Sequence, residues 1–188
     1  GWRDLCNLWN KPFSYNVKFI LSDNRSFITR FDNPTGNLDD WYEGCEIGEI
    51  WGLVTEGFFK DQADIDNHAD QWDVTSYPGD RPIEPGDLKY KDLDNNGKIN
   101  NGSWTVNDPG DYKVIGNNAS RYNYGADFTA EWNGLDFRVL LQGVGKKDWY
   151  PESHYFFGIY RAPWGNVLEN NLDHWTPENT DAYFPRLK

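Results

Sequence analysis

Residues 121–145 read RYNYGADFTAEWNGLDFRVLLQGVG, and this stretch decides the fold. Over residues 121–132 apolar and polar side chains alternate strictly, which is the period of a half-buried β-strand. Alternation resumes at Leu135 and continues to residue 145. The apolar positions are Tyr122, Tyr124, Ala126, Phe128, Ala130 and Trp132 in the first run, and Leu135, Phe137, Val139 and Leu141 in the second. The stretch therefore predicts two long strands.

Asn133 and Gly134 separate the two runs, and both residue types tolerate the positive φ that a two-residue hairpin turn requires. Such a turn places Trp132 opposite Leu135 and Phe128 opposite Val139, so the apolar sides of both strands coincide. Turn chemistry and side-chain pattern thus favour the same register.

The polar side of the predicted hairpin carries charged side chains of both signs. Glu131 lies opposite Asp136, which is unfavourable, but Arg138 lies diagonal to both Asp127 and Glu131 and offsets the repulsion. We therefore expect one apolar and one charged side on the same pair of strands.

Each run spans about eleven residues, more than the five or six usual in soluble sheets and close to the ~9–11 of a tilted transmembrane strand. Tyr122 and Trp132 lie at the two ends of the apolar side, where interfacial aromatic residues of a membrane strand lie. A soluble hairpin that packs its apolar side on a core is the alternative, and the pattern alone leaves it open.

The remaining sequence is rich in turn residues. Residues 14–22 form a weaker alternating run, and a turn at Asp23-Asn24 suggests that residues 26–31 are a returning strand. Residues 61–70 are expected to form one or two helical turns. Residues 33–120 and 146–188 are expected to be long loop regions, and short turns at one end with long loops at the other are typical of outer-membrane barrels.

The net charge is −12 at pH 7 and 17% of the residues are aromatic. Phosphate backbones would be repelled by this charge, so we expect no nucleic-acid partner. The aromatic content does not fit a disordered chain. Cys6 and Cys45 match no metal or redox spacing, and either a disulfide or two thiols is compatible with the sequence.

Several blocks of the chain resemble the SusC/RagA family of TonB-linked outer-membrane proteins. The resemblance begins at residues 15–36 (YNVKFILSDNRSFITRFDNPTG) and covers nearly the whole chain. The blocks that follow it in order are YEGCEIGEIWGLVTEGFF at 42–59, PGDLKYKDLDNNGKIN at 85–100, GDYKVIGNN at 110–118, RYNYG at 121–125, QGVGKKD at 142–148, WTPEN at 175–179 and FPRL at 184–187.

This resemblance implies an all-β chain: an antiparallel segment of a transmembrane, 22-stranded barrel with long extracellular loops. It implies import of nutrients across the outer membrane, most often an oligosaccharide and sometimes a peptide. A SusD-like surface lipoprotein and the TonB complex, which acts through the N-terminal region of such proteins, would be the partners, with the lipid bilayer around the barrel. We expect the 188 residues to be a fragment of the C-terminal half of that barrel domain.

The run DLDNNGKIN at residues 92–100 matches the first nine positions of an EF-hand calcium loop. Oxygen ligands fall at positions one, three and five, glycine at six, and a backbone carbonyl at seven. Ser103 stands where the bidentate acid is expected, and Asp108 or Asp111 is the candidate to replace it. The predicted calcium ligands are therefore Asp92, Asp94, Asn96, Lys98 (through its carbonyl) and Asp111. A turn held by its own side-chain-to-backbone bonds is the alternative.

Nothing in the sequence favours catalysis. The three histidines lack ligand spacing, and no Ser, Cys or Lys lies in a nucleophile motif, so we expect no enzyme. Exposed aromatic rings can instead stack on sugars or contact a partner protein. The candidates for these glycan or partner contacts are Trp149, Tyr150, Trp164 and Trp175. The competing hypothesis for the whole chain is a soluble, extracellular, calcium-stabilised carbohydrate-binding β module.

Overall fold

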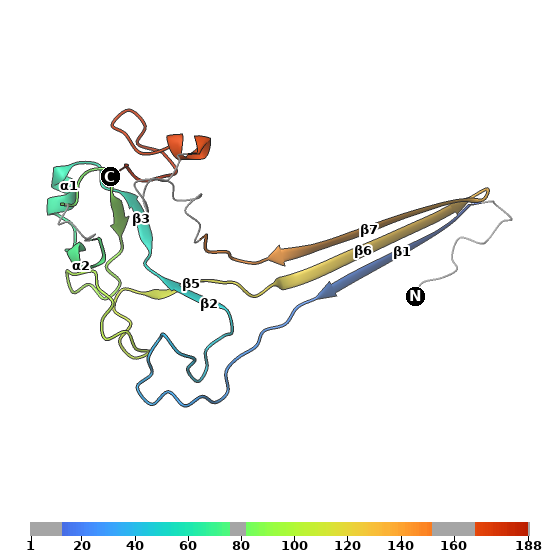
Figure 1. Ribbon diagram of the computed structural model, residues 1–188, viewed down its shortest axis with the longest axis horizontal. Coiled ribbons are helices and arrows are strands. Elements are labelled where there is room, and N and C mark those ends of the chain that lie inside the picture. Colours follow the sequence, from blue (N-terminus) through green and yellow to red (C-terminus); the bar gives the residue numbers. More distant parts are fainter. Residues whose placement is uncertain (1–12, 76–81, 152–167, 188) are drawn as a thin grey trace. The chain divides into compact units, whose positions relative to one another are not determined.

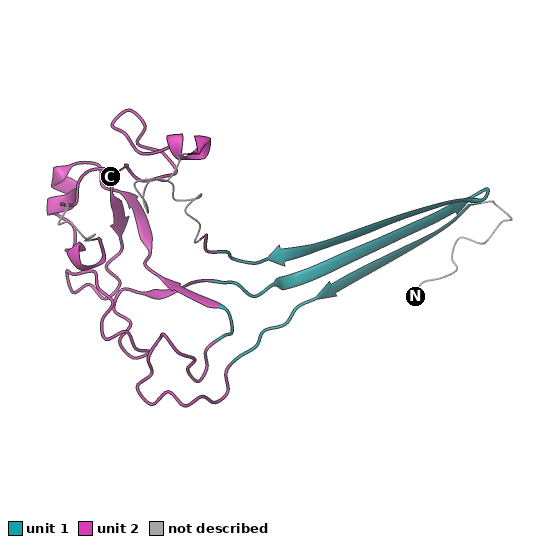
Figure 2. Cartoon of the chain, viewed as in Figure 1, with its two compact units in different colours: residues 1–27, 46–48, 117–149 teal, residues 28–45, 49–116, 150–188 magenta. Residues whose placement is uncertain are grey.

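The computed structural model describes residues 13–75, 82–151 and 168–187 (Figure 1). The described chain is built mainly from antiparallel strands and few helices, as predicted, and its strands form open sheets rather than a closed barrel. Within these ranges no helix is long and apolar enough to cross a bilayer. The chain divides into two compact units, which Figure 2 colours separately.

Unit 1 is a three-stranded antiparallel sheet. It contains β1 (Phe13–Ser22), β6 (Arg121–Trp132) and β7 (Leu135–Lys146), in the order β1-β6-β7. The three strands run side by side along their whole length (Figure 1). Strands β6 and β7 have 12 residues each, at least as long as the alternation predicts.

The predicted hairpin register is confirmed. Trp132 pairs with Leu135, and Phe128 pairs with Val139. Asn133 and Gly134 adopt φ values of 48° and 81°, the left-handed geometry for which an Asn-Gly turn is suited. Local turn chemistry and side-chain alternation therefore determine this part of the fold.

The expected strand at residues 26–31 is wrong. β1 pairs instead with β6, along a register that runs from Phe13–Trp132 to Ser22–Asn123. Its apolar side chains fall in phase with those of β6 in this register, so pairing with the distant hairpin joins the apolar sides of all three strands. Residues 26–31 form no strand, but a bridge joins Phe27 to Glu46 and backbone hydrogen bonds join Ser26 and Ile28 to residues 44–47.

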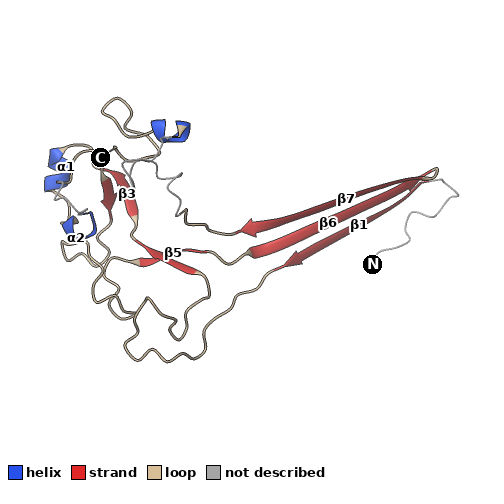
Figure 3. Ribbon diagram, in the orientation of Figure 1, coloured by secondary structure: helices blue, strands red, loops and turns tan. Residues whose placement is uncertain are grey.

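Unit 2 contains short elements joined by turns (Figure 3). Its pairs of strands are β2 (Glu49–Gly52) with β5 (Lys113–Asn117) and β3 (Thr55–Phe58) with β4 (Leu88–Tyr90). Its short helices are α1 (Gln62–Asp66), α2 (Trp72–Thr75) and the 3₁₀ turn η2 (Glu169–Leu172). The described part of the expected loop region 33–120 thus contains several small elements.

Helix α1 lies within the predicted helical stretch 61–70. Asp61 has an extended backbone and its side chain accepts a hydrogen bond from the Asp64 N–H at 2.8 Å, which caps the first turn. The helix therefore begins where the acidic run offers an N-cap.

A small core holds unit 2 together. Phe59 and Ile99 are almost completely buried, and so is the polar side chain of Gln71. The Gln71 amide donates to the Leu88 carbonyl at 2.7 Å and accepts from the Tyr90 N–H at 3.1 Å. The side-chain amide thus makes hydrogen bonds to the backbone of β4 like those that a neighbouring strand would make, and its buried polar atoms have partners.

The C-terminal segment docks on the turn before β4. The Trp175 indole lies directly over Gly86, where any Cβ would collide with the ring. Arg186 donates from Nε to the buried Asp87 carboxylate at 2.9 Å and from its backbone N–H to the Gly86 carbonyl at 3.0 Å. The blocks PGD and FPRL, about a hundred residues apart, thus form one local structure within unit 2.

Candidate functional site

One side of the unit 1 sheet carries an uninterrupted set of apolar side chains, here called the apolar face. The strand registers place on it Phe13, Tyr15, Val17, Phe19 and Leu21 of β1, Tyr124, Ala126, Phe128, Ala130 and Trp132 of β6, and Leu135, Phe137, Val139 and Leu141 of β7. No charged residue interrupts this set.

Most of the apolar face is open to the surroundings. The exposed fraction is 66% for Phe19, 59% for Phe137 and 59% for Leu141. Soluble monomers rarely expose contiguous apolar surface of this extent. The face spans eight residue steps on β1, which at about 3.4 Å a step is about 27 Å along the strand.

The opposite side of the sheet, here called the polar face, carries every charged side chain of the three strands except those of Arg121 and Lys146 at the strand ends. Its residues are Ser14, Asn16, Lys18, Ile20, Ser22, Asn123, Gly125, Asp127, Thr129, Glu131, Asp136, Arg138, Leu140, Gln142 and Val144. Arg138 donates to both oxygens of Asp127, at 3.0 and 2.6 Å, across the predicted diagonal. Glu131 lies opposite Asp136, as predicted, and accepts a hydrogen bond from the Ser14 hydroxyl at 3.2 Å.

Ion pairs fasten the end of the sheet away from the hairpin turn. Arg121 binds the Asp23 carboxylate through Nε and through Nη2, the latter at 2.6 Å. Arg25 holds Glu46 through two hydrogen bonds, which lowers the pKa of that carboxyl below its ordinary value. These pairs hold the segment that leaves β1 to the first residue of β6 and to Glu46.

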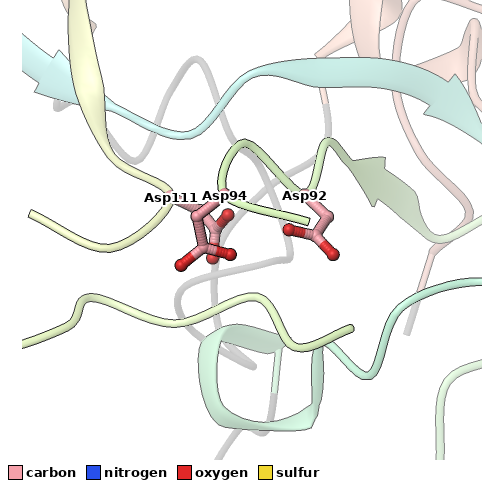
Figure 4. Close-up of side chains that lie close together, drawn as sticks. All are labelled: Asp92, Asp94 and Asp111. Carbon is pink, nitrogen blue, oxygen red and sulfur yellow. The ribbon is translucent and has the colours of Figure 1, made fainter. Parts of the chain in front are cut away.

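Three of the predicted calcium ligands lie together in unit 2. One carboxylate oxygen from each of Asp92, Asp94 and Asp111 lies within 4.8 Å of the other two, and Figure 4 shows the three side chains. Asp111 is completely buried, Asp92 half-buried and Asp94 exposed. Hard oxygen ligands at such separations suit a divalent cation such as calcium.

Backbone N–H groups shape the loop around these carboxylates. Asp92 accepts from the N–H of Asn95 at 2.7 Å and of Gly97 at 2.9 Å. Burial raises the pKa of the Asp92 carboxyl, but the bonds from Gly97 and Asn95 outweigh it, so this pKa lies below its ordinary value. The carboxylate is therefore charged at neutral pH and available to a cation.

Asp111, and not Asp108, completes the cluster. Its two oxygens accept from the N–H of Leu93 at 2.7 Å and of Asn100 at 2.9 Å, which closes the loop from both ends. Asp108 instead binds the hydroxyl of Ser103 at 2.6 Å. Of the two candidate acids that follow the insertion at residues 101–107, Asp111 is therefore the one that lies beside Asp92 and Asp94.

The remaining two predicted ligands stabilise the turn itself. Asn96 accepts from the Lys98 N–H at 2.8 Å and donates its amide to Asp94 at 2.7 Å. Lys98 forms a parallel bridge with Asp70. Both the calcium loop and the self-supported turn therefore remain compatible with these bonds.

The four candidate aromatic contacts differ in their surroundings. Trp149 and Tyr150 are 74% and 58% exposed and available for contact. Trp175 is only 9% exposed because it packs over Gly86. Trp164 lies outside the described residues.

The contact between Asp87 and Arg186 has no counterpart among the sequence predictions. Asp87 lies in the sequence block at residues 85–100 and Arg186 in the block at 184–187, but no turn or periodicity links positions this far apart. The sequence shows only that Asp87 follows Gly86 in a turn, and the burial of its carboxylate beside Arg186 is visible only in the folded chain.

Comparison of the chain with protein-family models and with curated proteins finds no match.

Proposed function

We propose that this chain forms part of the barrel wall and the extracellular loops of an outer-membrane, TonB-dependent nutrient importer of the SusC/RagA type. The observation that carries the proposal is the apolar face. It crosses three long, adjacent strands without a charge, and no described residue covers it.

Strand length and edge geometry support the same assignment. Strands of 10 to 12 residues fit a tilted crossing of a bilayer. The outer edges of β1 and β7 carry unpaired backbone groups among the described strands, and in a bilayer such edges require further strands. A 22-stranded barrel, in which this sheet contributes three neighbouring strands, satisfies both edges.

The polar face would then line the interior of the barrel. Asp127, Glu131, Arg138 and Gln142 would be in contact with water there, and the Arg138–Asp127 ion pair suits such a wall. Unit 2 would belong to the extracellular loops. Trp149, the last residue of unit 1, and Tyr150, which follows it in unit 2, would there be exposed to cargo or partner.

The proposed cargo is an oligosaccharide, with a SusD-like lipoprotein as the extracellular partner and TonB as the source of energy. The loop from Asp92 to Asp111 would bind a calcium ion that stabilises unit 2 and takes no part in chemistry. We propose no enzymatic activity.

Transport is tested in cells that lack the gene. Such cells should lose uptake of one class of fluorescently labelled oligosaccharide, and the natural protein should restore that uptake. Restored uptake should stop when a protonophore removes the energy that TonB delivers. Recovery of the protein in the soluble fraction, with uptake unchanged in the deletion strain, would contradict the proposal.

A further inference from the structure

Unit 2 contains a hollow of about 480 Å³ between β3 and the C-terminal segment. Phe58, Trp175 and Ala182 form its apolar walls, and Glu56, Lys60, Thr180 and Asp181 supply its polar side chains. The volume lies in the range of small-molecule sites.

The walls of the hollow are fixed by the core of unit 2. Trp175 packs over Gly86, and its backbone N–H donates to the Phe184 carbonyl at 2.9 Å. Ala182 is buried, and Phe59, which follows the Phe58 wall, is 1% exposed. A ligand would therefore meet a preformed surface and would not have to order it.

The polar side chains of the hollow are available to a ligand. Glu56, Lys60, Thr180 and Asp181 are all exposed, and within the described parts of the chain their side chains form no hydrogen bond or ion pair. Two carboxylates accept hydrogen bonds, the ammonium group of Lys60 donates them, and the Thr180 hydroxyl does both.

This mixture of groups restricts the class of ligand. An anion would be repelled, because two carboxylates face one ammonium group. A cation would be attracted by the remaining negative charge, so a charged amine is included among the probes below as the competing ligand. A purely apolar molecule would desolvate all of these charges. A neutral molecule with several hydroxyl groups and an apolar C–H surface matches both the polar side chains and the aromatic walls.

We propose that this hollow binds one sugar unit, with Glu56, Lys60, Thr180 and Asp181 bonded to ring hydroxyls and Phe58 in contact with ring C–H groups. The inference rests on the proposed function for the source of the sugar, which would be the oligosaccharide cargo. Binding at the hollow is nevertheless measurable without transport.

Saturation-transfer NMR on the full-length natural protein tests the proposal, in a detergent that contains no sugar. The probes are glucose, galactose, mannose, xylose and N-acetylglucosamine, with tetramethylammonium and inorganic phosphate as charged comparisons. We expect at least one neutral sugar to bind with a Kd in the millimolar range and the charged probes to give no signal.

Asp181→Ala and Glu56→Gln should each weaken sugar binding at least tenfold. Glu178→Gln, at an exposed carboxylate that does not line the hollow, should leave binding unchanged. Absence of sugar binding, equal binding in all variants, or preferred binding of tetramethylammonium would overturn the proposal. If these results appear while the protein still supports energy-dependent uptake, the sugar site is refuted and the transport function is not.

Discussion

The phenol ring of Tyr124 lies over Gly143, its partner across the β6–β7 pairing, and occupies the space that a Cβ on residue 143 would need. An aromatic side chain here covers a glycine on the neighbouring strand, which fills the gap that the glycine leaves in the apolar face. The packing of side chains at this end of the apolar face therefore depends on the contact between Tyr124 and Gly143.

Gly143→Ala should lower the free energy of unfolding by about 1 kcal/mol, because the new methyl group displaces the partly exposed Tyr124 ring. Gly125→Ala is the matched control, since its Cβ would meet only the Leu141 carbonyl at 3.8 Å. Urea unfolding of the purified protein measures both. Equal stability of the two variants would show that the Tyr124 ring has no fixed place over β7.

Phe128 and Thr129 are neighbours on β6 that point to opposite faces of the sheet, with Phe128 between Val17 and Val139. Phe128→Arg should destabilise the protein by about 2–4 kcal/mol in a membrane or micelle, since it places a charge at the middle of the apolar band. Thr129→Arg, which adds the same side chain to the polar face, should cost less than 1 kcal/mol. Assembly into the outer membrane and urea unfolding report the difference. A larger effect at Thr129 than at Phe128 would reverse the assignment of the two faces.

The proposed calcium site at Asp92, Asp94 and Asp111 gives a prediction that does not depend on the membrane. At a calcium concentration of one hundred times Kd, the ion should add about 2.7 kcal/mol to the free energy of unfolding, and a chelator should remove that gain. Asp94→Asn should abolish the response to the chelator, whereas Asp108→Asn should retain it because Asp108 binds Ser103. Equal responses in both variants would place the ion elsewhere.

The free energy of unfolding of unit 2 should fall in acid over a defined pH range. The Lys89 ammonium group lowers the pKa of Asp64, and the Ser103 hydroxyl lowers the pKa of Asp108. A carboxyl whose pKa is lower in the folded than in the unfolded chain adds stability above the unfolded value, about 3.9, and loses it as the pH falls through the folded value. Stability should therefore fall only below about pH 4.

Tryptophan fluorescence during urea unfolding at pH 5, 4 and 3, with a chelator present, measures this loss. Asp64→Asn should reduce the drop in the unfolding midpoint, because that variant has one fewer carboxyl to protonate. A drop of the same size in Asp64→Asn and the natural protein would show that Asp64 makes no contribution.

The hairpin is predictable from sequence because its determinants are local. Asn133-Gly134 specifies the turn, and alternation then fixes which residues pair. The pairing of β1 with β6 is not predictable in the same way, since about a hundred residues separate the two strands and no turn links them. The turn at Asp23-Asn24 suggests a local partner at residues 26–31, and that local prediction is wrong.

The candidate sites show the same division. Spacing alone identifies Asp92 and Asp94, because an EF-hand loop is a local pattern. Asp111 follows an insertion, and only the folded chain brings it, rather than Asp108, to the other two acids. The burial of Trp175 depends on its contact with Gly86. The sequence does not show that contact, so it gives no reason to separate Trp175 from the exposed Trp149.

Accessibility along β7 tests the central claim most directly. Single cysteines at residues 136–142, in a protein whose two natural cysteines are replaced, carry a nitroxide label, and the protein is placed in lipid bilayers. Labels at residues 137, 139 and 141 should collide with oxygen dissolved in the lipid, whereas labels at residues 136, 138, 140 and 142 should collide with a water-soluble nickel complex. Uniform access of the nickel complex to all seven positions would contradict the assignment of the apolar face to the bilayer.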